Sequence, residues 1–136
     1  MDIKNNNKIK KEKNNFKRFL NSWKNSFAGL KYVYTHELSF WIQSGASVLT
    51  IILGIIFKIS FFDVLLLLIA YIILMIGELL NAAIEATVDM VTEEYHPLAK
   101  IAKDCASSVG LVGGFLVLIV CIYVFLPYIT NIILGV

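Results

Sequence analysis

The sequence predicts an all-α membrane protein in which an amphipathic surface helix precedes three membrane-spanning helices. The chain has 136 residues, of which 58% are hydrophobic, and its mean hydropathy is +0.75. Soluble domains are only about half apolar, whereas a helix of about 20 mainly apolar residues can cross a bilayer. Three stretches of the chain meet that requirement, at residues 38–57, 61–88 and 98–126.

The three stretches differ in how plainly they predict a span. Residues 38–57 and 105–126 contain no Asp, Glu, Lys or Arg, whereas within 61–88 the longest run free of acidic and basic side chains is 64–77. In the last stretch, Ala106, Gly110, Gly113 and Gly114 are small enough for helices to pack closely in lipid. Since three thin spans leave little room to enclose a polar site, we expect a homo-oligomer.

The segment before the first span has two parts. Residues 1–15 are rich in Asn and Lys and predict a disordered basic leader, whereas residues 16–136 are expected to form one membrane domain. Phe16, Phe19, Trp23 and Phe27 recur every three or four residues, so 16–34 predicts an amphipathic helix. Basic residues beside this aromatic face suit the surface of an anionic bilayer. We expect no nucleic-acid partner, because the spans begin a few residues later.

Charge predicts the orientation of the spans. Residues 1–31 hold nine of the twelve basic residues and two of the ten acidic ones. A Lys-rich flank beside the first span stays in the cytoplasm, so the N-terminus is expected inside and the 58–63 connection outside. The next connection, which carries Lys100 and Lys103, is expected to return to the cytoplasmic side.

Polar side chains interrupt the second half of the middle span. Glu78, Asn81, Glu85 and Asp89 lie within an arc of about 80° on one helix face, because successive residues turn by about 100°. An ionisable group near the bilayer centre costs about 2.5 to 3.5 kcal/mol, so these groups need partners, water or a metal. A polar seam that only fixes helix register is one interpretation of this face.

The neighbours of this face favour a functional site. The short connection to the last span should bring Asp89 close to residues 103–107, and Glu37 starts the first span on the same side. Clustered carboxylates beside a lysine suit Mg²⁺ bound with nucleotide phosphates, although an ion or proton path would use the same groups. The chain has no Walker sequence, protein-kinase signature or Cys/His metal cluster, so its chemistry would depend on the carboxylates.

Four motifs in this order resemble the small prokaryotic diacylglycerol kinase family, which includes the undecaprenol kinases of Gram-positive bacteria. They read Glu78-Leu-Leu-Asn81, Ala83-Ile-Glu85-Ala-Thr-Val-Asp89, Glu94-Tyr95-His96 and Ala102-Lys103-Asp104, and the resemblance covers about residues 22–126. It implies a homotrimeric lipid kinase of the bacterial plasma membrane, with sites between subunits and ATP and Mg²⁺ as phosphoryl donor and cofactor.

The resemblance also implies a role for each matched residue. Glu78 corresponds to the general base, Glu37 and Glu85 to the Mg²⁺ ligands, and Asn81 and Asp89 to their polar support. The nucleotide and its phosphates are contacted by the counterparts of Arg18, Glu94, Tyr95, His96, Lys103 and Asp104, and Ser107 lies near the lipid headgroup. For His96 and Tyr95, a place in the interfacial loop is an equal alternative.

Two departures from the family pattern and the choice of substrate stay open at this point. Trp41 follows Phe40 where Arg is common, and Ala82 stands where Ser or Thr is frequent. The 91–104 segment is more similar to Gram-positive members, which favours undecaprenol, with diacylglycerol as the alternative. A non-enzymatic bundle that conducts ions or protons is the third hypothesis.

Overall fold

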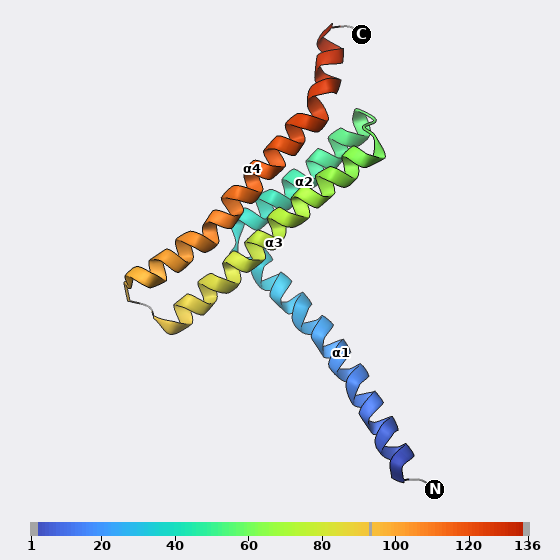
Figure 1. The fold of residues 1–136 in the computed structure, drawn as a ribbon, viewed down its shortest axis with the longest axis vertical. Helices are drawn as coiled ribbons and strands as arrows, with labels where there is room; N and C mark the ends of the chain where they lie inside the picture. The colour runs from blue at the N-terminus through green and yellow to red at the C-terminus, as the bar shows by residue number, and fades with distance from the viewer. Residues whose placement is uncertain (1–2, 93, 135–136) are drawn as a thin grey trace. The chain divides into compact units, whose positions relative to one another are not determined.

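The computed structural model describes residues 3–92 and 94–134, and side chains from residue 15 onward. Its elements are four α-helices, α1 (Ile3–His36), α2 (Leu38–Ile56), α3 (Phe61–Val91) and α4 (Pro97–Leu134), labelled in Figure 1. No described residue lies in a strand, which confirms the all-α class. The chain divides into two compact units, Met1–His36 and Glu37–Val136.

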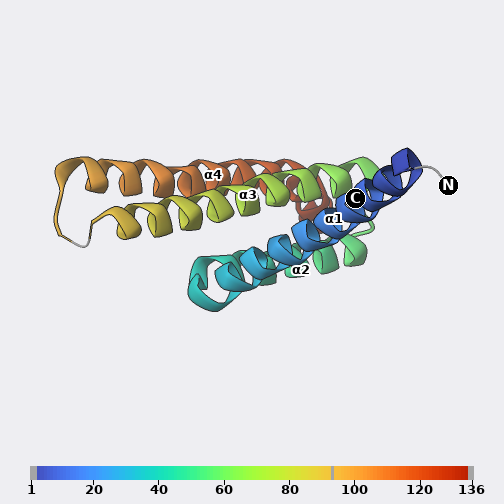
Figure 2. The ribbon, with the colours of Figure 1, turned by 90° about the horizontal axis from the view of Figure 1, so that it is seen from below.

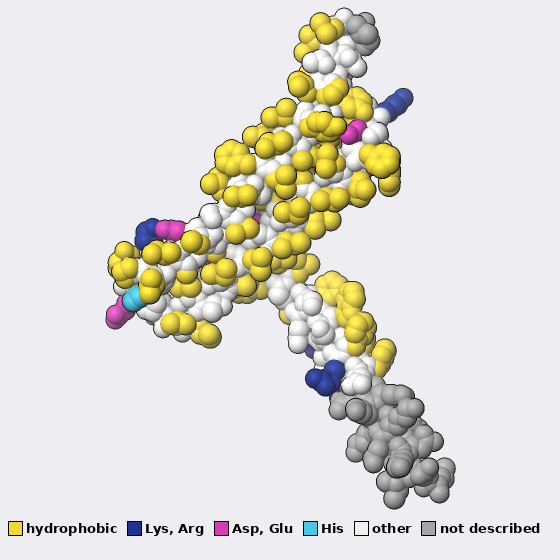
Figure 3. Space-filling view, in the orientation of Figure 1, with side chains coloured by type: hydrophobic (Ala, Val, Ile, Leu, Met, Phe, Trp, Pro, Cys, Tyr) yellow, Lys and Arg dark blue, Asp and Glu magenta, His cyan; other side chains and the backbone are white. Residues whose placement is uncertain are grey.

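The first unit consists of the amphipathic helix. Along α1, the rings of Phe19, Trp23 and Phe27 follow one another with centroids 6.2 Å apart, and all three side chains are exposed. Figure 3 shows apolar side chains along one side of the described part of this helix and basic side chains on another. The helix begins at Ile3, well before residue 16, where the sequence pattern predicts its start. The disordered state of the leader and the domain bounds stay predictions.

The second unit contains three helices long and apolar enough to cross a membrane, α2, α3 and α4. Their bounds follow the three predicted spans, except that α3 continues to Val91 and α4 to Leu134. α4 includes Pro127, which removes a backbone hydrogen bond, and the helix changes direction towards its C-terminal end (Figure 1). Most of the large apolar side chains of the unit are exposed, as expected for a surface that faces lipid or another subunit.

Helix α3 is the centre of this unit and packs against both α2 and α4. Figure 2 shows α3 and α4 running side by side from the loop that joins them. Their core is formed by Leu67, Ala70, Val120 and Val124. Further along, Gly113 faces Leu74 so closely that an added Cβ would lie 3.2 Å from the Leu74 Cα. Small residues on α4 therefore let the two backbones approach, as the sequence predicts.

Helix α2 is joined to α3 by polar contacts as well as by apolar packing. In the part of the helices nearest their connection, the Thr50 and Tyr71 hydroxyls lie 2.8 Å apart and both side chains are buried. The connection itself ends at Ser60, which caps α3 by accepting a hydrogen bond from the Asp63 N–H. A second polar contact, at the other end of α2, forms part of the candidate site.

Candidate functional site

The Glu78 carboxylate is buried at the junction of three helices. Its side chain is 8% exposed and projects from α3 towards α2. Ser39 Oγ donates to Glu78 Oε2 at 2.9 Å, and Gln43 Nε2 donates to Glu78 Oε1 at 2.6 Å. On the α4 side, a Cβ added to Gly110 would lie 2.9 Å from Glu78 Oε1. Two neutral donors and a close backbone therefore hold this carboxylate.

One turn further along α3, an amide is hydrogen-bonded to a second carboxylate. Asn81 Nδ2 donates to Glu85 Oε1 at 3.0 Å, and both side chains are half-buried. The Asn81 Oδ1 atom is buried and has no hydrogen-bond partner among the described residues. A buried acceptor without a donor is costly, so this oxygen is available to a ligand or cation that reaches it.

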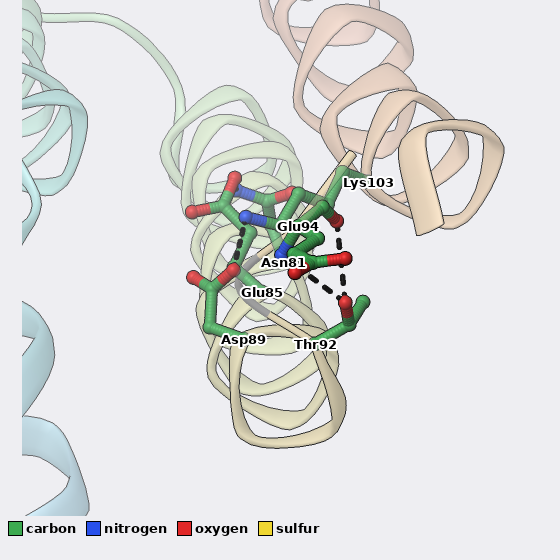
Figure 4. A network of polar contacts seen from close by, with 6 residues as sticks. All are labelled: Asn81, Glu85, Asp89, Thr92, Glu94 and Lys103. Carbon is green, nitrogen blue, oxygen red and sulfur yellow. Dashed lines mark hydrogen bonds and ion pairs between the residues drawn. The ribbon is translucent and has the colours of Figure 1, made fainter. Parts of the chain in front are cut away.

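An ion pair connects the end of α3 with the start of α4. Lys103 Nζ lies 2.5 Å from Asp89 Oδ1, and Lys100 pairs with Asp104 on α4. Figure 4 shows Asn81, Glu85 and Asp89 on α3 with Lys103 reaching Asp89 from α4. The Asp89 and Lys103 side chains are 60% and 38% exposed, so the pair is open to exchange for another charged partner.

A polar cleft of about 380 Å³ opens beside these pairs, between the end of α3 and the start of α4. The connecting segment is shaped locally: the Thr92 hydroxyl accepts from the Glu94 N–H, and His96 Nδ1 accepts from the Leu98 N–H. His96 thereby caps α4 ahead of Pro97. The polar residues that line the cleft are Asp89, Thr92, Glu94, Tyr95, His96, Lys100, Lys103 and Asp104.

The structure brings together some of the residues singled out in the sequence and separates others. The cleft gathers Asp89, Lys103, Asp104 and the 94–96 segment. Glu78 turns instead towards α2, away from the cleft lining, although the helical arc predicts one common face. Glu37 is half-buried before the first turn of α2 and makes no capping bond with its side chain. Ser107 is exposed one turn after Lys103.

Two further predicted residues need separate mention. Arg18 is exposed on α1 and belongs to the unit Met1–His36, so its relation to the cleft stays a prediction. Among the described residues, no group of three or more His, Cys, Asp or Glu side chains is arranged to hold a metal ion. The pairing of Glu37 with Glu85 as metal ligands therefore also stays a prediction.

Four contributors to the site were not identified from the sequence. Ser39 and Gln43 lie four apart on one face of α2, but the same helix also carries Ser44, Ser47 and Thr50, so the sequence does not single them out. Lys100 neutralises Asp104, and Thr92 shapes the loop and lines the cleft. Neither stands out in a segment where most residues are polar.

These features define a class of protein. Three helices that could cross a membrane carry a buried carboxylate on α3, and a cleft with two lysines and three carboxylates opens at the helix ends. Lysine ammonium groups beside carboxylates suit a phosphate-bearing ligand and its cation, while the deeper carboxylate meets the apolar part of the helices. The arrangement fits a membrane enzyme that handles phosphate next to lipid.

Comparison with known proteins gives the family. The family model of the prokaryotic diacylglycerol kinases matches residues 24–125. The chain is 33% identical to the undecaprenol kinase of Bacillus subtilis over 87% of its own length and 96% of that protein. It is 37% identical to the diacylglycerol kinase of Pseudomonas aeruginosa, over 71% and 79% of the two chains, and 32% identical to that of Escherichia coli K12, over 72% and 80%. The chain belongs to the prokaryotic diacylglycerol kinase family and is a lipid kinase, which confirms the resemblance.

Proposed function

We propose that the protein transfers the γ-phosphate of ATP to the hydroxyl of undecaprenol at the cytoplasmic face of the bacterial plasma membrane. The observation that carries the proposal is the buried Glu78 carboxylate on the same helix as the charged cleft. The similarity to an undecaprenol kinase over 96% of that protein's length supports the lipid. Diacylglycerol is the second candidate, supported by the diacylglycerol kinases among the relatives.

The cleft is proposed to hold the nucleotide. Lys103 and Lys100 supply two ammonium groups, each paired at present with an aspartate. An ATP phosphate carries more negative charge than a carboxylate and offers more acceptor oxygens, so it can replace Asp89 as the partner of Lys103. Tyr95 is 80% exposed and can turn its ring towards the adenine, with Glu94 beside it. Arg18 is proposed as a further contact to the nucleotide.

Glu85 and Asn81 fit a Mg²⁺ ion that accompanies ATP. Magnesium prefers oxygen ligands and is usually held by one or two carboxylates together with phosphate oxygens and water. Glu85 offers a carboxylate, and Asn81 Oδ1, which has no hydrogen-bond partner among the described residues, is a second oxygen on the adjacent side chain. Glu37 is proposed as a further acidic ligand. When bound, the ion neutralises charge that develops on the transferring phosphoryl group.

Glu78 is proposed as the general base. It accepts the proton of the lipid hydroxyl while the hydroxyl oxygen bonds to the γ-phosphorus and the bond from that phosphorus to the β–γ bridging oxygen breaks, which releases ADP. Its buried position on a helix that could cross the membrane suits a hydroxyl attached to apolar chains. Ser107 on α4 is proposed to lie near the lipid headgroup.

A homotrimer with sites between subunits is part of the proposal. Eleven residues separate Glu78 from Asp89, which is about 16 Å along a helix at 1.5 Å per residue. A base and a phosphate held that far apart in one chain would need the nucleotide to span the gap or a neighbouring subunit to close it. The exposed apolar side chains of α2 and α4 are available for such packing.

The test is a side-by-side assay of undecaprenol and diacylglycerol with radiolabelled γ-phosphate ATP and Mg²⁺ in detergent micelles. We expect label in undecaprenyl phosphate at the higher kcat/KM. Higher kcat/KM for diacylglycerol would select the alternative substrate. Label in neither lipid, together with ion or proton flux in ATP-free liposomes, would replace the kinase proposal with that of a conducting bundle.

A further inference from the structure

The contacts of α2 with Glu78 point to a role for two residues outside the roles assigned above. Ser39 and Gln43 lie one turn apart in the first part of α2, both half-buried. Their side chains donate to different oxygens of the same carboxylate, at 2.9 and 2.6 Å. Ser47, two turns after Ser39 on the same helix, instead donates to the backbone carbonyl of Ser44.

The two hydrogen bonds leave Glu78 able to accept a proton. An ionised carboxylate has about four lone-pair sites, and Ser39 and Gln43 each occupy one, on different oxygens. Both donors are neutral, so they fix the carboxylate without forming the charged pair that a lysine or arginine would make. The group facing Glu78 from α4 is Gly110, which has no side chain.

The amide of Gln43 is oriented by Glu78. Its Oε1 atom is buried and lacks a hydrogen-bond partner among the described residues, so that oxygen does not fix the orientation of the amide. The hydrogen bond from Gln43 Nε2 to Glu78 Oε1, at 2.6 Å, is therefore the contact through which this amide can fix the position of the carboxylate.

We propose that Ser39 and Gln43 are positioning residues that hold the Glu78 carboxylate for proton transfer from the lipid hydroxyl. This inference rests on the proposed function, because it requires Glu78 to be the base. Proton transfer needs a base within hydrogen-bond reach of the hydroxyl, and a carboxylate free to rotate would spend less time there. Loss of either donor should therefore lower kcat and leave the KM for ATP unchanged.

The test measures kcat and KM for ATP in the full chain carrying Ser39→Ala, Ser39→Thr or Gln43→Leu, with Ser47→Ala as the matched control. Loss of a hydrogen bond to a charged group corresponds to about a tenfold to hundredfold drop in kcat. We expect that drop for Ser39→Ala and Gln43→Leu, recovery in Ser39→Thr, which keeps the hydroxyl, and wild-type kcat for Ser47→Ala. Equal rates for Ser39→Ala and Ser47→Ala would overturn the inference.

A second arm shows whether the effect passes through Glu78. Ser39→Ala is combined with Glu78→Gln, and the residual rate is compared with that of Glu78→Gln alone. A positioning role predicts no further loss, whereas a further tenfold loss would mean that Ser39 acts by another route and would overturn the inference. Wild-type kcat in Glu78→Gln would instead refute Glu78 as the base, so the two failures are distinguishable.

Discussion

The close approach of α4 to Glu78 predicts that Gly110→Ala separates activity from stability. The new Cβ would lie 2.9 Å from Glu78 Oε1, whereas ordinary contact begins at 3.4 Å, so the oxygen must move by about 0.5 Å. The atom in the way is the end of a flexible side chain, so the fold can adjust. Alanine also favours a helix over glycine by about 1 kcal/mol, and the melting temperature should stay the same or rise.

The same substitution should lower kcat although it does not destabilise the fold. Catalytic groups must be held within about 0.5 Å of their productive positions, and a misplacement of about 1 Å can cost a hundredfold in rate. We therefore expect Gly110→Ala to lower kcat about tenfold. The assay compares γ-phosphate transfer and thermal unfolding with those of Gly45→Ala, whose added Cβ meets nothing within 4 Å. A Gly110→Ala protein with full kcat would refute the reasoning.

Three further predictions address the metal, the cleft and the helix packing. Glu85→Gln should regain part of its transfer rate at raised Mg²⁺, because a weakened ligand is offset by concentration, whereas Glu78→Gln should not; the reverse pattern would exchange their roles. Lys103→Ala should lower kcat/KM about a hundredfold while the melting temperature changes little, because an exposed ion pair contributes about 0 to 1 kcal/mol; equal loss in Lys58→Ala, at the α2–α3 connection, would contradict this. Thr50→Val should destabilise the protein by about 1 kcal/mol in thermal unfolding with kcat retained, and loss of transfer in a fully folded variant would be the contrary result.

Helices α2, α3 and α4 could be predicted from the sequence because each lies in an apolar stretch long enough to cross a membrane. The approach of Asp89 to Lys103 could also be predicted, because the short loop between α3 and α4 keeps the end of one helix close to the start of the other. The partners of Glu78 could not. Which residues of α2 contact Glu78 depends on how α2 is rotated about its own axis. Because α2 has apolar side chains on several faces, the sequence allows more than one rotation. Its contacts with Ser39 and Gln43 required the structure.

The start of α1 and the assembly of the chain could not be predicted from the sequence pattern. The aromatic spacing from Phe16 predicts the amphipathic helix, but nothing in the Asn- and Lys-rich segment before it predicts helix, because few apolar side chains there could be buried. The proposed roles of Glu37 and Arg18 depend on the proposed homotrimer with sites between subunits, because one chain does not bring these two residues into the cleft lining.

The most direct test of the account is the affinity for Mg·ATP of two variants, measured at equilibrium with a fluorescent nucleotide. The account assigns phosphate binding to the cleft and proton transfer to the buried carboxylate. Lys103→Ala should weaken nucleotide binding by about tenfold or more, since a charge-assisted contact to phosphate is lost. Glu78→Gln should bind Mg·ATP with wild-type affinity and fail to phosphorylate lipid. Weakened binding in Glu78→Gln together with wild-type affinity in Lys103→Ala would contradict this division of the site.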